Sequence, residues 1–255
     1  MRELMAATPV IDTALASLTH DPSRPRVTGY TADGRTELSG TVLRNWASKV
    51  AGLLLDELGA APGDEVLVTT PAHWQTAGIL LGAWWAGMSV TDTEGPDVVA
   101  AFVPPGGDAV CDEIFVVSGH PLGLGLTGLP PHQRDYTSSV LGQADRFTAR
   151  TATPAARALR SGSTVIPAAT LHGAMTAPSG IVPGQRVLTA GEWSFDGAVP
   201  GVVRLLLRPL STGASVIHST DLDPAGDGDA WAHRAEVEKA DVTIGVDVAG
   251  LPRLG

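Results

Sequence analysis

The stretch EVLVTTPAHWQTAGILLGAWWAGMSVT, residues 65–91, decides the fold class of this chain. Its opening residues, 65–70, form an apolar run that is typical of a buried strand, and residues 89–91 begin another strand. Between them, residues 72–86 are apolar on nearly all sides, which predicts a buried helix that ends at Gly87. Strand, helix and strand in this order form a β-α-β unit, which predicts a parallel sheet with a right-handed crossover.

The segments around this unit continue the α/β pattern. Residues 26–38 predict a hairpin that turns at Asp33-Gly34, and Ser39 is placed to cap a long helix over residues 40–58. Further predicted strands cover residues 98–103, 113–117, 186–190, 215–219 and 242–246, and further helices cover 3–18, 135–145, 154–160, 198–210 and 229–240. The expected fold class is α/β, with parallel or mixed sheets flanked by helices. It is organised either as one domain over residues 1–255 or as two lobes, about 1–150 and 151–255.

Composition restricts the classes of function. The formal net charge of −10 disfavours nucleic-acid partners and anionic membrane surfaces. A hydrophobic share of 44% supports a sizeable core, but no apolar run is long enough for membrane insertion. Cys111 is the only cysteine, so the chain has no intrachain disulfide, which fits a cytoplasmic protein.

Residues 36–92 resemble the opening of AMP-dependent acyl-CoA synthetases and related adenylation domains. The motif L-G-x-x-x-G-D-x-V of that superfamily is matched by Leu58, Gly59, Gly63, Asp64 and Val66, and its Ala-Gly helix end by Ala86 and Gly87. Residues 204–219 and 236–245 are similar to later elements of the same half. The chain thus resembles the N-terminal half of this superfamily, and within it a small actinobacterial group of short homologues.

The resemblance implies a phosphate-binding loop of the form T-S-G-[ST]-T-G-x-P-K-G, whose amides, hydroxyls and lysine hold ATP. The candidate nucleotide-binding residues are the surviving first half of that loop, Ser161, Gly162, Ser163 and Thr164. Val165 stands at the second glycine, where a β-branched residue resists a positive φ, and Ala168 stands at the lysine. Losing such a charged partner costs roughly 2–5 kcal/mol. Alternatively, the SGST segment is an ordinary turn and strand start, and the loop is missing altogether.

Other features that the resemblance implies are also missing. The aromatic-histidine pair of the acyl pocket falls near Trp193-Ser194, where there is no histidine. The adenine-binding, ribose-binding and C-terminal catalytic groups of the superfamily lie beyond the position of Gly255. Because no linker or tag is visible at Gly255, we expect the chain to be the whole product. We expect no catalytic residues.

Several local patterns are better explained as ordinary structure. Residues 123–128 match G-x-G-x-x-G, but the prolines that follow prevent the helix that dinucleotide binding needs. Ser118 and His120 lack the glycine pattern of a nucleophile elbow. Histidines 120, 132 and 172 lack metal-ligand spacing, so no metal site is predicted. Arg204 and Arg208 share a helix face that we interpret as solvated rather than anion-binding.

The sequence therefore predicts a catalytically inactive homologue of acyl-adenylate-forming enzymes that works by binding or assembly and needs no cofactor. Two alternatives stay open. One is an acyl or acyl-CoA binding protein. The other is an acid:CoA ligase that uses ATP or AMP with Mg²⁺, either alone or completed by another chain. Because a truncated parallel sheet leaves an unpaired edge, we also expect a homodimer or a partner protein.

Overall fold

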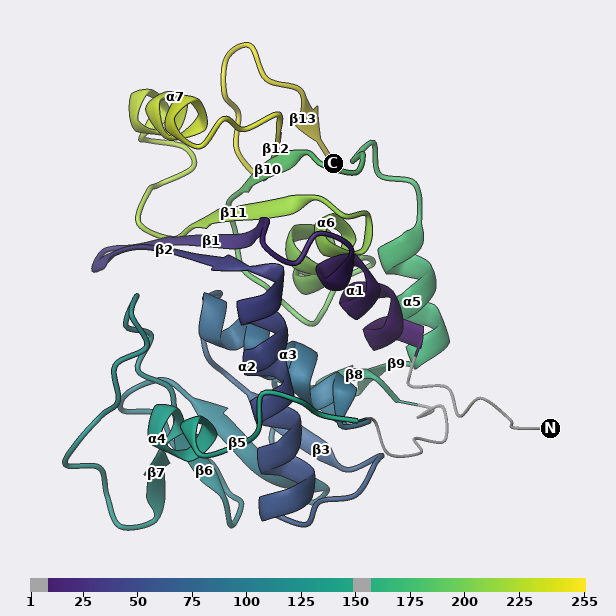
Figure 1. Ribbon diagram of the computed structural model, residues 1–255, viewed down its shortest axis with the longest axis vertical. Coiled ribbons are helices and arrows are strands. Elements are labelled where there is room, and N and C mark those ends of the chain that lie inside the picture. Colours follow the sequence, from purple (N-terminus) through teal and green to yellow (C-terminus); the bar gives the residue numbers. More distant parts are fainter. Residues whose placement is uncertain (1–8, 149–156) are drawn as a thin grey trace.

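The computed structural model describes residues 9–148 and 157–255, whose strands form two sheets (Figure 1). The strand bounds are Pro25–Thr31 (β1), Gly34–Ser39 (β2), Glu65–Val68 (β3), Ser89–Thr91 (β4), Val98–Val103 (β5), Ile114–Val116 (β6), Gln133–Asp135 (β7), Leu159–Ser161 (β8), Thr164–Ile166 (β9), Arg186–Thr189 (β10), Ser215–Ser219 (β11), Val242–Ile244 (β12) and Arg253–Leu254 (β13). Sheet A has the order β13-β12-β10-β11-β1-β2, and sheet B has the order β7-β6-β5-β3-β4-β8-β9. Only β1–β2 and β8–β9 pair antiparallel, which confirms the predicted α/β class with mostly parallel sheets.

The helices occupy the space between the sheets and the outer side of sheet A (Figure 1). They are Pro9–His20 (α1), Gly40–Gly52 (α2), Trp74–Trp85 (α3), Tyr136–Leu141 (α4), Ala168–Thr176 (α5), Arg208–Ser211 (α6) and Gly228–Val237 (α7). Two π-helical turns, Leu53–Glu57 (η1) and Val203–Leu207 (η2), extend α2 and lead into α6. In the described part of the chain, no helix is both long and apolar enough to cross a bilayer.

The main hydrophobic core lies between the two sheets and joins them. It contains Val27 of β1 in sheet A, Val66 of β3 in sheet B, and buried residues of α1, α2, α3 and α5. A smaller cluster packs α7 against the outer face of sheet A through Trp231 and Ile217. The sheets do not divide the chain at residue 150, because β1 and β2 belong to sheet A and β8 and β9 to sheet B.

Helices α2 and α3 pack closely at the centre of this core. Every residue of α3 is buried, as its apolar sequence predicts. A Cβ atom on Gly82 would lie only 2.5 Å from Val50 Cβ and 2.6 Å from the Ala47 carbonyl oxygen of α2. The glycine thus allows the two helix backbones to approach. The N-terminus of α2 is capped by Ser39 Oγ, which accepts a hydrogen bond from the Val42 amide at 3.3 Å, as predicted.

The predicted elements agree with the structure along most of the chain, with one clear error. The helix predicted over residues 154–160 is wrong at its end, because Leu159–Ser161 is strand β8, which pairs with β4 and β9. The remainder of that prediction, residues 154–156, and residues 3–8 of the first predicted helix lie outside the described residues. Helix α5 was not predicted, and the helix predicted over residues 135–145 is limited to α4.

Candidate functional site

A cavity of about 630 Å³ lies where the carboxyl ends of strands from both sheets meet. Its walls come from the residues that follow β3 and β4 in sheet B and β10 and β11 in sheet A. The carboxyl ends of parallel strands are the usual place for a ligand in α/β folds. The apolar lining consists of Val68, Pro71, Ala72, Leu80, Trp193, Phe195, Leu222 and Pro224. This cavity is the candidate functional site.

The charged residues that line the cavity are both acidic, Asp92 after β4 and Glu192 after β10. Among the described residues that line the cavity, there is no lysine or arginine. Of the two lysines in the chain, Lys49 donates to the Gln143 carbonyl at 2.6 Å and pairs with Asp145 at 3.0 Å. The cavity therefore carries a negative potential and has no ammonium group of its own.

The predicted nucleotide-binding residues, 161–164, form the tight turn between β8 and β9. Ser161 pairs with Thr164, so Gly162 and Ser163 are the two residues of a hairpin turn. Gly162 has a φ of +54°, which is usual for glycine in such a turn. Val165 lies in β9 and Ala168 begins α5, so neither belongs to a phosphate-cradling loop in this structure. That these residues bind phosphate stays a prediction.

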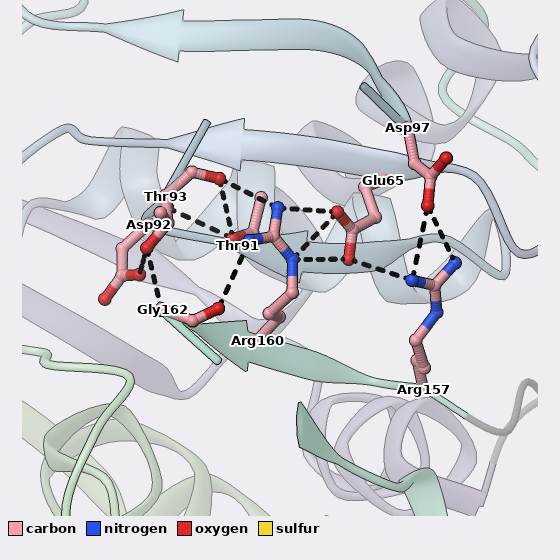
Figure 2. Close-up of polar contacts among 8 residues, drawn as sticks. All are labelled: Glu65, Thr91, Asp92, Thr93, Asp97, Arg157, Arg160 and Gly162. Carbon is pink, nitrogen blue, oxygen red and sulfur yellow. Dashed lines mark hydrogen bonds and ion pairs between the residues drawn. The ribbon is translucent and has the colours of Figure 1, made fainter. Parts of the chain in front are cut away.

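The polar groups of this turn are engaged by the residues that follow β4 (Figure 2). Ser161 Oγ donates to Asp92 Oδ2 at 2.7 Å, and the Gly162 amide donates to Thr93 Oγ1 at 2.9 Å. Thr93 Oγ1 in turn donates to Asp92 Oδ1 at 2.7 Å. Two donors of the turn, the Ser161 hydroxyl and the Gly162 amide, are therefore already bonded, and the acceptor of the first is a carboxylate.

A buried ion pair fixes strand β8 against sheet B. Arg160 holds Glu65 with its Nε and Nη2 atoms at 2.7–3.0 Å and also donates to the Thr93 carbonyl at 2.9 Å. The Glu65 side chain is only 1% exposed. Arg157 lies at the outer end, between Glu65 and Asp97, whereas Asp92 lies at the opposite end of the cluster (Figure 2).

A histidine lies beside Trp193 in space although none follows it in sequence. The ring of His218, from β11, lies 5.2 Å from the Trp193 ring, and its Nδ1 atom is 2.8 Å from Thr189 Oγ1. Complete burial lowers the pKa of His218 to about 4, so the imidazole is neutral at pH 7. The buried His218 Nε2 and Trp193 Nε1 atoms have no hydrogen-bond partner among the described residues.

The sequence patterns interpreted as ordinary structure lie apart from this cavity. Residues 123–128 form a loop without a following helix, held through the Leu126 amide, which donates to Asp135 Oδ1 at 2.8 Å. Ser118 Oγ accepts from the His120 amide at 3.3 Å, and the Nδ1 atom of the His120 ring accepts from the Leu122 amide at 3.0 Å, so both groups serve the local turn. Arg208 Nε donates to the Ala174 carbonyl at 2.7 Å and so braces α5.

The remaining histidines of interest have separate neighbours. His132 lies 3.4 Å from Asp108, and His172 lies 3.1 Å from Thr13. Within residues 9–148 and 157–255, no group of three or more histidine, cysteine or acidic side chains could hold a metal ion.

Solved structures of adenylate-forming ligases share this fold. The Brucella canis acyl-CoA synthetase superposes with a TM-score of 0.75 and 14% identity, over 92% of this chain and 46% of that one. The anthranilate CoA ligase AuaEII gives 0.71 and 13%, over 95% and 50%, and a benzoate CoA ligase from Burkholderia xenovorans LB400 gives 0.70 and 17%, over 92% and 50%. The chain thus spans about half the length of these proteins and has the fold of their N-terminal subdomains.

A closer likeness exists at the level of sequence. No protein-family model matches the chain. A protein of Mycobacterium tuberculosis (strain ATCC 25618 / H37Rv), described as a TIGR03089 family protein, is 36% identical over 217 residues, which cover 80% of this chain and 86% of that protein. At this identity and coverage, the chain belongs to the TIGR03089 family.

Proposed function

We propose that this chain is a non-catalytic relative of adenylate-forming ligases that acts by binding or assembly and does not activate carboxylic acids. The observation that supports this most directly is the bonding of the β8–β9 turn. The Ser161 hydroxyl and the Gly162 amide already donate to Asp92 and Thr93. A nucleotide phosphate would have to break these bonds and then lie beside a carboxylate.

Electrostatics support the same proposal. Two like unit charges about 5.5 Å apart repel each other by about 3 kcal/mol at an effective dielectric constant near 20. The cavity presents Asp92 and Glu192 and no basic residue to a polyphosphate. Mg²⁺ would offset part of the repulsion but would not restore the missing donors. We therefore propose that ATP and AMP bind weakly or not at all.

Isothermal titration with ATP and Mg²⁺ tests this proposal, and we expect no binding in the micromolar range. The Asp92→Lys variant supplies a cation beside the turn and removes the carboxylate that accepts from Ser161. If ATP binds poorly because the turn has a carboxylate and no cation, this variant should gain ATP binding with a Kd on the order of 1 mM. Micromolar binding to the unaltered chain would contradict the proposal.

Release of pyrophosphate distinguishes the enzymatic alternative. A panel of carboxylic acids with ATP and Mg²⁺ should give no pyrophosphate above the background without protein. Signal from the chain alone, or only after a complementing chain is added, would instead identify an acid:CoA ligase of the adenylate-forming type.

The acyl-binding alternative has one observation in its favour, the apolar walls of the cavity. The same cavity presents Asp92 and Glu192 to the carboxylate of a fatty acid or to the phosphates of coenzyme A. Since like charges repel, an acyl ligand is the less favourable occupant. The anionic probe described below measures this directly.

The assembly part of the proposal rests on the sheet edges. β2 and β13 end sheet A, and β7 and β9 end sheet B, so each presents unpaired backbone groups in the described chain. Val165 of β9 is also 43% exposed. We expect light scattering to give about twice the chain mass of 26.2 kDa, or a complex with a partner. A monomeric mass over a wide concentration range would contradict the assembly part of the proposal and leave ligand binding as the proposed role.

A further inference from the structure

The cavity combines two carboxylates with aromatic walls. Among the described residues, no basic side chain forms an ion pair with Asp92 or Glu192. Each oxygen of Asp92 accepts one neutral hydroxyl, which leaves further lone pairs free. Trp193 and Phe195 line the same space, and aromatic faces attract cations. Both features favour a positively charged group.

The aromatic wall also carries an unpaired polar group. Trp193 is only 7% exposed and lines the cavity, and its buried indole N–H has no acceptor among the described residues. The Nε2 atom of His218, whose ring lies 5.2 Å from the Trp193 ring, is likewise buried and unpaired there. Because the indole N–H is itself buried, Trp193 offers a ligand its aromatic ring rather than its N–H.

We propose that the cavity binds a small organic cation, with an apolar or aromatic body against Trp193 and Phe195 and an ammonium group facing Asp92 and Glu192. The inference rests on the binding role proposed above and specifies the ligand class. The volume of about 630 Å³ lies within the range that holds drug-sized ligands. The two carboxylates and the aromatic walls of the cavity suit such a cationic molecule and disfavour an anionic one of the same shape.

Three benzamides that share the same aromatic ring and carbonyl test the charge preference by isothermal titration. They are N-(2-aminoethyl)benzamide, which is cationic, N-propylbenzamide, which is neutral, and N-benzoylglycine, which is anionic. The cation should bind at least tenfold more tightly than the anion, with the neutral probe between them. Added salt should weaken binding of the cation alone.

Variants separate the contributions of the three residues. Glu192→Gln and Asp92→Asn should each lower cation affinity about fivefold and leave the neutral probe unchanged. Trp193→Phe should lower the affinity for all three probes together, because they share the aromatic ring that packs against this wall. Asp247→Asn is the matched control, since this exposed carboxylate pairs with Arg253 and does not line the cavity, and it should change nothing.

The inference is overturned if the anion binds as tightly as the cation or more so, which would support the acyl-binding alternative. It is equally overturned if no probe binds, or if the carboxamide variants do not change the charge preference. None of these outcomes depends on ATP, so the nucleotide titration tests the proposed loss of catalysis separately.

Discussion

Replacing Gly82 by valine is expected to lower the free energy of unfolding by about 3–5 kcal/mol. The first added atom would lie 2.5 Å from Val50 Cβ and 2.6 Å from the Ala47 carbonyl oxygen. Neither obstacle is the end of a flexible side chain, so α2 and α3 must separate to admit the new side chain. These helices join the two sheets through the main core. Urea unfolding followed by circular dichroism measures the loss.

Substitution of a second glycine, Gly173, is expected to raise rather than lower the free energy of unfolding. Gly173 lies in α5, is exposed, and has nothing within 4 Å of its hypothetical Cβ. Gly173→Ala should therefore stabilise the chain by about 0.5–1 kcal/mol, because alanine restricts the unfolded chain without a clash. If Gly82→Val unfolded at the same urea concentration as the unaltered chain, the close approach of α2 and α3 would be absent from the protein.

Much of this central packing was predictable from sequence, because the signals are local and strong. A helix that is apolar on all sides must be covered on all sides, and its glycines mark where a neighbour comes close. Gly82 lies at such a close approach to α2. Ser39 caps α2 and the hairpin forms as predicted, since caps and tight turns depend on only a few adjacent residues. The turn itself lies one residue earlier than predicted, at Ala32 and Asp33, because Gly34 pairs with Thr31.

Strand β8 shows where local reasoning fails. Leu159–Ser161 follows an alanine-rich segment, which favoured the helix predicted over 154–160. Its strand conformation depends on pairing with Thr91 and Val90 of β4, almost seventy residues earlier in the chain. Such long-range pairing overrides short-range propensity. The membership of β1 and β2 in sheet A depends on equally distant partners and was not predictable from periodicity.

The candidate site was predictable only in part. The residues at 161–164 could be singled out because glycine and hydroxyl residues stand together in sequence. Their neighbours could not, because Asp92 contacts Ser161 across a sequence separation of 69 residues. An acidic residue directly after the predicted strand over 89–91 was a usable signal for Asp92, since ligands bind at strand carboxyl ends. No comparable signal placed His218 beside Trp193.

The buried pair of Glu65 and Arg160 provides the second large expected effect. Arg160→Met should destabilise the chain by about 3–5 kcal/mol, because it leaves a carboxylate that is 1% exposed without its main cation. Arg157, whose Nη1 atom lies 3.7 Å from Glu65 Oε1, can replace only part of that interaction. Thermal and urea unfolding of the variant measure the change.

Two controls separate this cause from the loss of an ordinary surface contact. Arg157→Met should cost only about 0–1 kcal/mol, because Arg157 and its partner Asp97 are 40% and 59% exposed. The double variant Glu65→Leu/Arg160→Met should recover most of the stability lost in Arg160→Met, because it removes the stranded charge. Equal losses in Arg160→Met and Arg157→Met, or a double variant no more stable than Arg160→Met, would contradict a buried ion pair as the anchor of β8. In either case the β8–β9 turn would depend for its position on the bonds of Ser161 and Gly162 to Asp92 and Thr93.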